Sequence, residues 1–93
     1  MAEYSVGEAL KRLMAEAGWG EKLQEYRIKE DWEAIAGSTI ARYTSNIQLR
    51  NKVLVLSTDV APLKHEIMLN KQNLIEKINL HFGERMVNDI QVR

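Results

Sequence analysis

The segment SNIQLRNKVLVLS, at residues 45–57, constrains the possible folds of this chain most strongly. Polar and apolar residues alternate before an Asn-Lys pair and an apolar run rich in β-branched residues follows it, a pattern typical of two strands joined by a two-residue turn. This turn sets Leu49 opposite Leu54. Ile47 and Leu56, which are each two residues further from the turn, then also lie opposite each other. Because side chains alternate along a strand, these four share one face of a β-hairpin, which we expect to be core. The second face is half apolar, and we expect the N-terminal helices to cover part of it.

A first helix is predicted over residues 5–18, SVGEALKRLMAEAG. Ser5 and Glu8 have the spacing of a capping box, in which each side chain satisfies a free amide at the helix start. Gly18 is expected to end the helix. Apolar residues recur every three and four positions and form one stripe, made of Val6, Leu10, Leu13, Met14 and Ala17.

A second helix is predicted from Glu21 to Ala36. Gly37 is expected to end it in the left-handed region of backbone space, because glycine alone has no steric cost there. Ser38 can then cap a short turn that carries Ile40 back toward the core.

Residues 58–83, TDVAPLKHEIMLNKQNLIEKINLHFG, form the longest periodic segment. They predict one long helix with Asp59 as its N-cap, Pro62 in its first turn and Gly83 at its end. The apolar positions of this helix cover one broad arc, which we expect to pack against the buried face of the hairpin.

The final segment, RMVNDIQVR, alternates again and predicts a third strand, with Met86, Ile90 and Val92 on one face. The predicted order is therefore α-α-β-β-α-β, an α+β fold. Because the long helix separates the hairpin from the last strand, it is expected to cross one face of a three-stranded sheet. Residues 1–93 are expected to form a single domain, since a chain of 93 residues can bury only one modest core.

The composition limits which compartments and which partners suit this protein. The chain has no cysteine, which excludes a disulfide framework and any cysteine-based zinc site and is typical of a reducing compartment. Its N-terminus lacks the basic start of a signal peptide, and no apolar run is long enough to span a bilayer. We therefore expect a cytoplasmic protein. The formal net charge is zero, which argues against holding nucleic acid by bulk charge alone.

No group of residues predicts a catalytic site. His65 and His81 are sixteen positions apart on one predicted helix, too far to share a metal ion, and we expect both on the surface. No phosphate-binding loop, nucleophile elbow or dinucleotide-binding pattern occurs. We expect neither enzyme activity nor a metal or cofactor.

Nucleic acid is the next candidate ligand, because the part of the chain after Ala41 carries eight basic and five acidic side chains. The Gly-x-x-Gly clamp of KH domains and the aromatic residues of RNA-recognition sheets are both absent. The basic side chains suffice for phosphate contacts but not for base recognition, and a plain solvated surface is the alternative. The candidates are Arg42, Arg50, Lys52, Lys64, Lys71 and Lys77.

Three apolar side chains are candidate anchors for a protein partner. Trp19 lies between two glycines and could be exposed, whereas Trp32 lies on the stripe of the second helix and is expected in the core. Leu69 and Leu80 fall opposite the apolar arc of the long helix. We expect another helix to cover them, and exposure to a partner is the alternative.

Three segments in this order resemble one known family: DWEAIAGSTIARYT at 31–44, NKVLVLSTDVAPLKHEIMLNKQNLIEKIN at 51–79 and FGERMVNDIQVR at 82–93. The first fits the pattern W-x-x-I-x-G-x-x-I-A-x-x-T, from Trp32 to Thr44. A turn at Asn51, an Ile-Asn pair ending at Asn79 and a Phe-Gly pair follow. Together they resemble the DciA-like proteins, long catalogued as a domain of unknown function, over nearly the whole chain.

The resemblance implies a KH-like fold, which the predicted element order independently allows. It also implies binding to the hexameric replicative helicase of bacteria and some affinity for DNA. We therefore expect a non-enzymatic adaptor that binds this helicase in replication initiation, with weak, sequence-independent DNA contact. An RNA-binding KH-like module and a protein-interaction domain without a nucleic-acid role are the alternatives.

Overall fold

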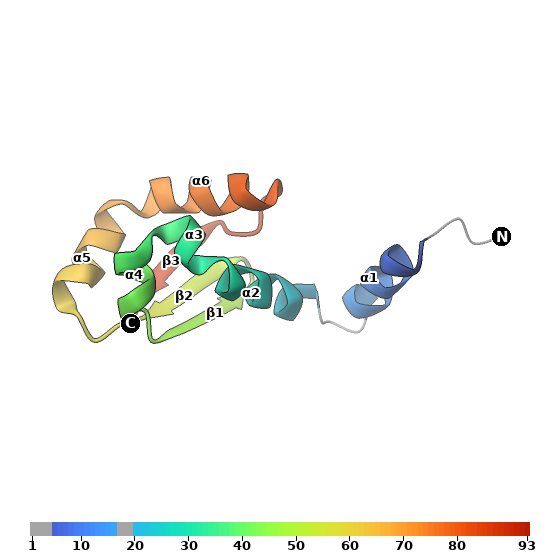
Figure 1. The fold of residues 1–93 in the computed structure, drawn as a ribbon, viewed down its shortest axis with the longest axis horizontal. Coiled ribbons are helices and arrows are strands. Elements are labelled where there is room, and N and C mark those ends of the chain that lie inside the picture. The colour runs from blue at the N-terminus through green and yellow to red at the C-terminus, as the bar shows by residue number, and fades with distance from the viewer. Residues whose placement is uncertain (1–4, 17–19) are drawn as a thin grey trace.

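The computed structural model of the chain describes residues 5–16 and 20–93. Helices and a three-stranded sheet make the predicted α+β fold, and their order is compatible with the KH-like fold that the resemblance implies (Figure 1). Two of the predicted helices are each divided. In chain order the elements are α1 (Val6–Glu16), α2 (Gly20–Glu30), α3 (Trp32–Ala36), α4 (Ser38–Tyr43), β1 (Asn46–Arg50), β2 (Val53–Ser57), α5 (Ala61–Leu69), α6 (Lys71–Phe82) and β3 (Asp89–Val92).

The sheet has the strand order β1-β2-β3. β1 and β2 pair antiparallel in the predicted register, with Leu49 opposite Leu54. Ile47 lies opposite Leu56, also as predicted. Both residues of the Asn-Lys turn have positive φ, 52° and 64°, as a tight hairpin turn of type I′ requires. β3 pairs parallel to β2, and α5 and α6 supply the crossover that parallel pairing needs.

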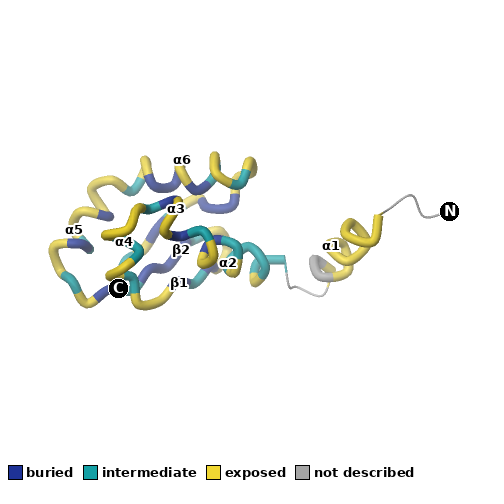
Figure 2. Tube along the Cα trace, in the orientation of Figure 1, coloured by how far each residue is buried: buried dark blue, intermediate teal, exposed yellow. Residues whose placement is uncertain are grey.

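Helices α2, α3, α5 and α6 bury side chains against one face of the sheet, so the predicted core face is confirmed. In Figure 2 the buried residues of the strands and of α6 lie toward one another. Burying a side chain of Leu or Ile size contributes roughly 1.5 to 3 kcal/mol. The cluster consists of Ile28, Trp32, Ile35, Ile47, Leu49, Leu54, Leu56, Leu63, Ile67, Leu74, Ile75, Ile78, Met86, Val87 and Ile90.

The N-terminal helices do not cover the second face of the sheet, contrary to the prediction. α2 buries Ile28 in the core on the first face, and α1 lies beyond the end of the sheet (Figure 1). Val55 is nevertheless buried on the second face. It lies on the central strand, where its neighbours in register are Gln48 and Gln91, whose longer side chains flank it.

The corner at Gly37 joins the helices to the hairpin. Gly37 has φ 92°, positive as predicted, but its ψ is 161°. The residue therefore lies outside the left-handed helical region, in a region open essentially to glycine alone. Helix α4 follows at once with Gly37 at its N-cap position, so the prediction that Ser38 caps a short turn is wrong. Ser38 is instead the first residue of a helix.

The helix predicted from Glu21 to Ala36 is divided at Asp31. Backbone hydrogen bonds continue across this residue, from its N–H to the Arg27 carbonyl at 3.2 Å and from the Ile35 N–H to its carbonyl at 3.0 Å. Its side chain reaches His81 on α6, at 2.9 Å. Hydrophobic periodicity carries no sign of this division, because the apolar stripe runs on through it.

The long predicted helix is divided at Asn70. The Asn70 side-chain amide donates to the Glu66 carbonyl at 3.1 Å, and the Asn70 backbone N–H donates to the same carbonyl. Such local bonds between an Asn side chain and the backbone compete with a regular helix. The division separates α5 from α6, and both of them contribute to the same core.

The ends of these elements differ partly from prediction. Val60, not Asp59, holds the N-cap position of α5, whereas Pro62 lies in the first turn as predicted. α6 ends at Gly83, also as predicted, and Gly83 lies in the left-handed region. The last strand is shorter than expected, since Met86 precedes β3 in a loop while remaining fully buried.

α1 lies apart from the sheet (Figure 1). Ser5 caps its start as predicted, because the Ser5 hydroxyl accepts the Glu8 N–H at 3.1 Å. The protein is elongated, with extents of 55 × 21 × 20 Å. The predicted end of this helix at Gly18 lies outside the described residues. The predicted stripe is exposed at Val6 (87%), Leu10 (55%) and Leu13 (62%).

We expect Gly37→Ala to lower the free energy of unfolding by about 1 to 3 kcal/mol, because alanine is strained at this backbone conformation. No atom lies within 4 Å of the position that an added Cβ would take, so the cost comes from the backbone alone. Urea denaturation followed by circular dichroism measures it.

Gly83 provides the matched comparison, because its Cβ position is equally free but its φ of 68° lies in the left-handed region. Asn tolerates that region. Gly83→Asn should therefore be mild, whereas Gly37→Asn should be as harmful as Gly37→Ala. Equal losses for the two asparagine variants would contradict this account of Gly37.

Candidate functional site

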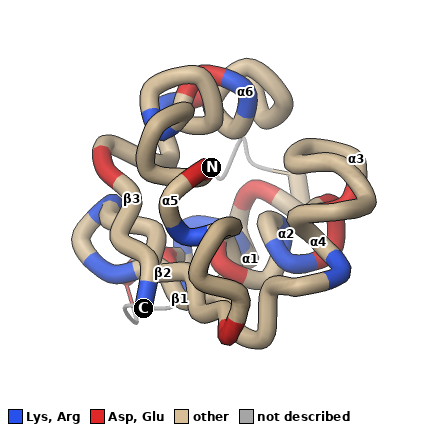
Figure 3. The backbone as a smooth tube through the Cα atoms, turned by 90° about the vertical axis from the view of Figure 1, so that its left-hand side faces the viewer, with Lys and Arg blue, Asp and Glu red and all other residues tan. Residues whose placement is uncertain are grey.

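The six predicted basic residues lie on several elements. Arg50 and Lys52 are at the hairpin turn, and Arg42 is near the end of α4, with its guanidinium 5.8 Å from the centre of the Tyr43 ring. The other three lie on α5 and α6. In the view of Figure 3, acidic and basic residues are interspersed along the chain. Arg50 and Lys52 of this set lie close together, because Lys52 belongs to the turn that directly follows Arg50.

Lys71 is engaged in an ion pair. Its Nζ lies 2.9 Å from Oδ1 of Asp89, the first residue of β3. The hydrogen bond from Lys71, followed by one from the Ile90 backbone, holds the pKa of Asp89 below its ordinary value. Lys71 therefore ties the start of α6 to the start of β3, and a phosphate would have to compete with Asp89 for its charge.

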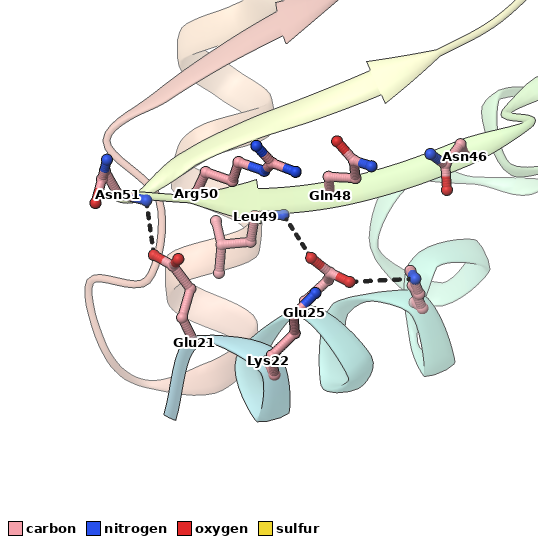
Figure 4. Close-up of a pocket in the computed structure, with 9 residues that line it drawn as sticks. Glu21, Lys22, Glu25, Asn46, Gln48, Leu49, Arg50 and Asn51 are labelled. Carbon is pink, nitrogen blue, oxygen red and sulfur yellow. Dashed lines mark hydrogen bonds and ion pairs between the residues drawn. The ribbon is translucent and has the colours of Figure 1, made fainter. Parts of the chain in front are cut away.

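A cavity of about 420 Å³ lies between α2 and the edge strand β1 (Figure 4). We call it the hairpin-edge pocket. Its basic residues are Lys22 and Lys29 of α2 and Arg50 of β1, and its acidic residues are Glu21 and Glu25. Three cations and two carboxylates leave a small positive excess, and side-chain amides line the remainder. Its full lining is Glu21, Lys22, Glu25, Lys29, Asn46, Gln48, Leu49, Arg50 and Asn51.

The two glutamates of this pocket bind the exposed edge of the sheet. Glu25 Oε2 accepts the Leu49 N–H at 2.9 Å, and Glu21 Oε2 accepts the Asn51 N–H at 2.7 Å. An edge strand normally presents such N–H groups to another chain, so the carboxylates occupy the place of a neighbouring strand. The pocket is therefore closed to strand addition at these two amides, while its cations remain at the rim.

Burial and hydrogen bonding act in opposite directions on Glu25. Burial raises the pKa of this carboxyl, but the bonds from the Leu49 N–H and from Lys29 outweigh burial, and the pKa lies below its ordinary value. The Lys29 Nζ lies 3.3 Å from Glu25 Oε1. The ionised form of Glu25 is thus the one that holds α2 against β1.

The sequence did not point to Lys22, Lys29 or the two glutamates as site residues. The spacing of Glu25 and Lys29, four residues apart on one helix, signals their ion pair. No sequence signal places α2 beside β1, so the pocket itself could not be foreseen.

The predicted partner anchors do not form one patch. Leu69 and Leu80 are 72% and 81% exposed, so the expectation that another helix covers them is wrong. They are separated by most of the length of α6, roughly 16 Å at the rise of an α-helix. Trp19 lies outside the described residues. Exposed apolar side chains therefore occur at both ends of α6.

The residues of the W-x-x-I-x-G-x-x-I-A-x-x-T pattern serve the fold. Trp32 is buried, as predicted, and its Nε1 donates to the Thr44 hydroxyl at 3.1 Å. That hydroxyl in turn donates to the Ile40 carbonyl at 2.6 Å. These two hydrogen bonds link α3 to the end of α4 and so hold the corner at Gly37 in place. The pattern therefore marks a joint between helices and sheet.

Asn79 of the Ile-Asn pair has a comparable role. Its Oδ1 accepts the N–H groups of Met86 and Val87, at 2.9 and 3.0 Å, and its Nδ2 donates to the Val87 carbonyl at 2.9 Å. One side chain thus satisfies three backbone groups of the loop that leads into β3. The loop can then bury two apolar residues without leaving these backbone groups unpaired.

His65 and His81 are exposed, as predicted. Over residues 5–16 and 20–93, no three His, Asp or Glu side chains are grouped so as to hold a metal ion. Within the same ranges, no helix has the length and apolar character that crossing a membrane demands.

A family model described as "Dna[CI] antecedent, DciA" matches residues 5–92. The chain belongs to the DciA family. A relative from Corynebacterium glutamicum (strain R), named UPF0232 protein, is 19% identical over 88 residues, which cover 95% of this chain and 49% of the relative. The DciA-family chain described here thus spans about half the length of that relative. The match includes the corner at Gly37, the hairpin, the crossover helices and β3.

We expect Glu25→Gln to lower the free energy of unfolding by about 1 kcal/mol at neutral pH, because a neutral amide accepts the Leu49 N–H more weakly. Since the pKa of Glu25 lies below its ordinary value of 4.5, its contribution is present above that pH and is lost as the pH falls through the folded-state pKa. Urea denaturation at several pH values should show the variant and the native protein converging in acid. Glu76→Gln, at an exposed position of α6, is the control. A stability difference between the Glu25→Gln variant and the native protein that persists unchanged in acid would rule out this role of Glu25.

Proposed function

We propose that this DciA-family chain is a non-enzymatic adaptor that binds the bacterial replicative helicase and makes weak, sequence-independent contact with DNA. The match of the family model to residues 5–92 carries the proposal, because the family is linked to loading or operating that helicase. The fold supports it too, since the residues that the family pattern singles out hold the core and leave the surface free for partners.

The hairpin end is the best-supported place for DNA contact. Lys52 lies in the turn directly after Arg50, and Lys22 and Lys29 approach from α2, where Lys29 is also paired with Glu25. Cations on both sides of a polar cavity can contact successive phosphates. The nearby glutamates limit the net charge, which fits weak binding without base recognition. Lys71 contributes less, because Asp89 already neutralises it.

The helicase contact is proposed at the exposed apolar side chains of α5 and α6. Leu69 and Leu80 expose most of their surface, which is the requirement for anchoring a protein partner. Trp19 remains a proposed contact only because Trp side chains are common anchors in protein interfaces.

We expect Lys52→Glu to weaken binding of fluorescent single-stranded DNA several-fold, measured by fluorescence anisotropy. The slope of log affinity against log salt should also fall in magnitude, by about 0.7 for each phosphate of the single strand that the variant no longer neutralises.

Arg93→Glu makes the same change of charge at the end of the sheet opposite the hairpin turn and should leave binding near that of the native protein. Salt-independent binding, or equal effects of the two variants, would remove the hairpin from the proposal. A clear preference for single-stranded RNA over DNA would favour an RNA-binding module instead.

We expect the protein to form a complex of defined stoichiometry with the hexameric replicative helicase of its own organism, detected by size-exclusion chromatography with light scattering. Leu69→Glu and Leu80→Glu should each reduce the fraction bound, because a buried charge at an apolar contact is costly.

Tyr26→Glu is the matched control, since Tyr26 is 59% exposed on α2 but outside the proposed contact. With the protein shown to be folded, absence of a complex with and without DNA would overturn the adaptor role. A complex that tolerates both leucine variants would overturn only the proposed surface.

A further inference from the structure

Two apolar features of this chain are unpartnered. The first is the stripe of α1, formed by Val6, Leu10 and Leu13, which projects into solvent (Figures 1 and 2). A single helix of this length is marginal in water and gains most of its stability by packing an apolar face. The stripe therefore needs a surface to cover it.

The second feature is a groove between α6 and the pair α3–α4, which we call the α3–α6 groove. One part has a volume of about 200 Å³ and the other of about 460 Å³, and Lys77 borders both. Most of its wall is apolar, and Leu80 stands exposed at one end. Its lining includes Ala34, Ile35, Ile40, Leu74, Lys77 and Leu80.

We infer that α1 of one copy docks in the α3–α6 groove of a second copy. The exchange is reciprocal, so each copy gives a helix and receives one, as a twofold dimer requires. The long shape supports a second copy as the occupant, because α1 extends the long axis away from its own groove.

The dimensions of the two features agree. The stripe from Val6 to Leu13 spans roughly 10 Å at 1.5 Å per residue. The groove from Leu74 to Leu80 spans roughly 9 Å by the same measure. Three apolar side chains spaced at i, i+4 and i+7 are the usual anchors of a helix in a groove. The stripe and the groove are thus of similar length.

The charges beside the two features are complementary. On a helical projection, Glu16 flanks the stripe on the side of Leu13, whereas Lys11 lies on the polar face. The groove has Lys77 on α6 and Glu66 on α5 at its rim. In the described structure Lys77 takes part in no side-chain ion pair, so it is available to Glu16 of a docked α1.

Reciprocal docking buries twice the area of one helix in one groove. One short helix in one groove is a small contact, below the roughly 1,000 Å² expected of a specific interface. Two such contacts related by a twofold axis double the buried area and must form together. Pairing of two α1 helices alone would bury less and would leave both grooves empty.

Sedimentation velocity of the full chain over a wide range of concentration tests the inference. We expect a monomer–dimer equilibrium. Leu10→Glu on α1 and Leu80→Glu in the groove should each raise the dimer dissociation constant tenfold or more, which is about 1.4 kcal/mol. Leu69→Glu is the matched control, because Leu69 is equally exposed but lies outside the groove.

Each outcome is decisive. A monomer at all concentrations would overturn the inference, and so would a dimer that Leu80→Glu leaves intact, which would indicate pairing of α1 helices. Loss of the dimer in the Leu10 and Leu80 variants, with circular dichroism unchanged and the Leu69 variant still dimeric, would support it. Self-association needs no helicase and no DNA, so this result is independent of the proposed function.

Discussion

The pairing of β1 with β2 is the constraint on which the other elements depend. It sets four Leu and Ile side chains on one face of the sheet, and a sheet this small is not stable without cover. Every helix from α2 to α6 except the short α4 buries residues in that same cluster. A slip of the hairpin by one residue would turn all four side chains to the other face and leave the helices nothing to pack against.

A few polar side chains then close the margins of the core. The Trp32–Thr44 bond closes the corner at Gly37, Asn79 holds the loop before β3, and Glu25 attaches α2 to the sheet edge. Each satisfies groups that burial would otherwise leave unpaired, which is costly. The family pattern accordingly describes how the core is closed. The proposed partner contacts include side chains outside the pattern, such as Leu80, which is both a proposed helicase contact and part of the α3–α6 groove. Self-association and helicase binding would therefore compete for it.

The reliable sequence predictions were those that rest on local physics. The hairpin register follows from a period of two around a tight turn, and the Ser5 cap follows from one side chain and one nearby amide. The two helix divisions were missed because the apolar stripe continues through Asp31 and Asn70. The N-cap of α5 was wrong because Asp59 is a good cap by type, yet the helix begins one residue later, after Val60.

The candidate site was predictable in its residue types and not in its geometry. Sequence alone determined which side chains are charged, which positions share the face of an element, and that Trp32 belongs to the core. Only the tertiary structure decided that Lys71 is paired with Asp89, that Glu25 meets the edge of β1, and that Leu80 has no neighbour over it. The physical reason is that periodicity records which side of an element is apolar. Which element arrives on that side, and which charges it brings, depends on how all the elements pack at once.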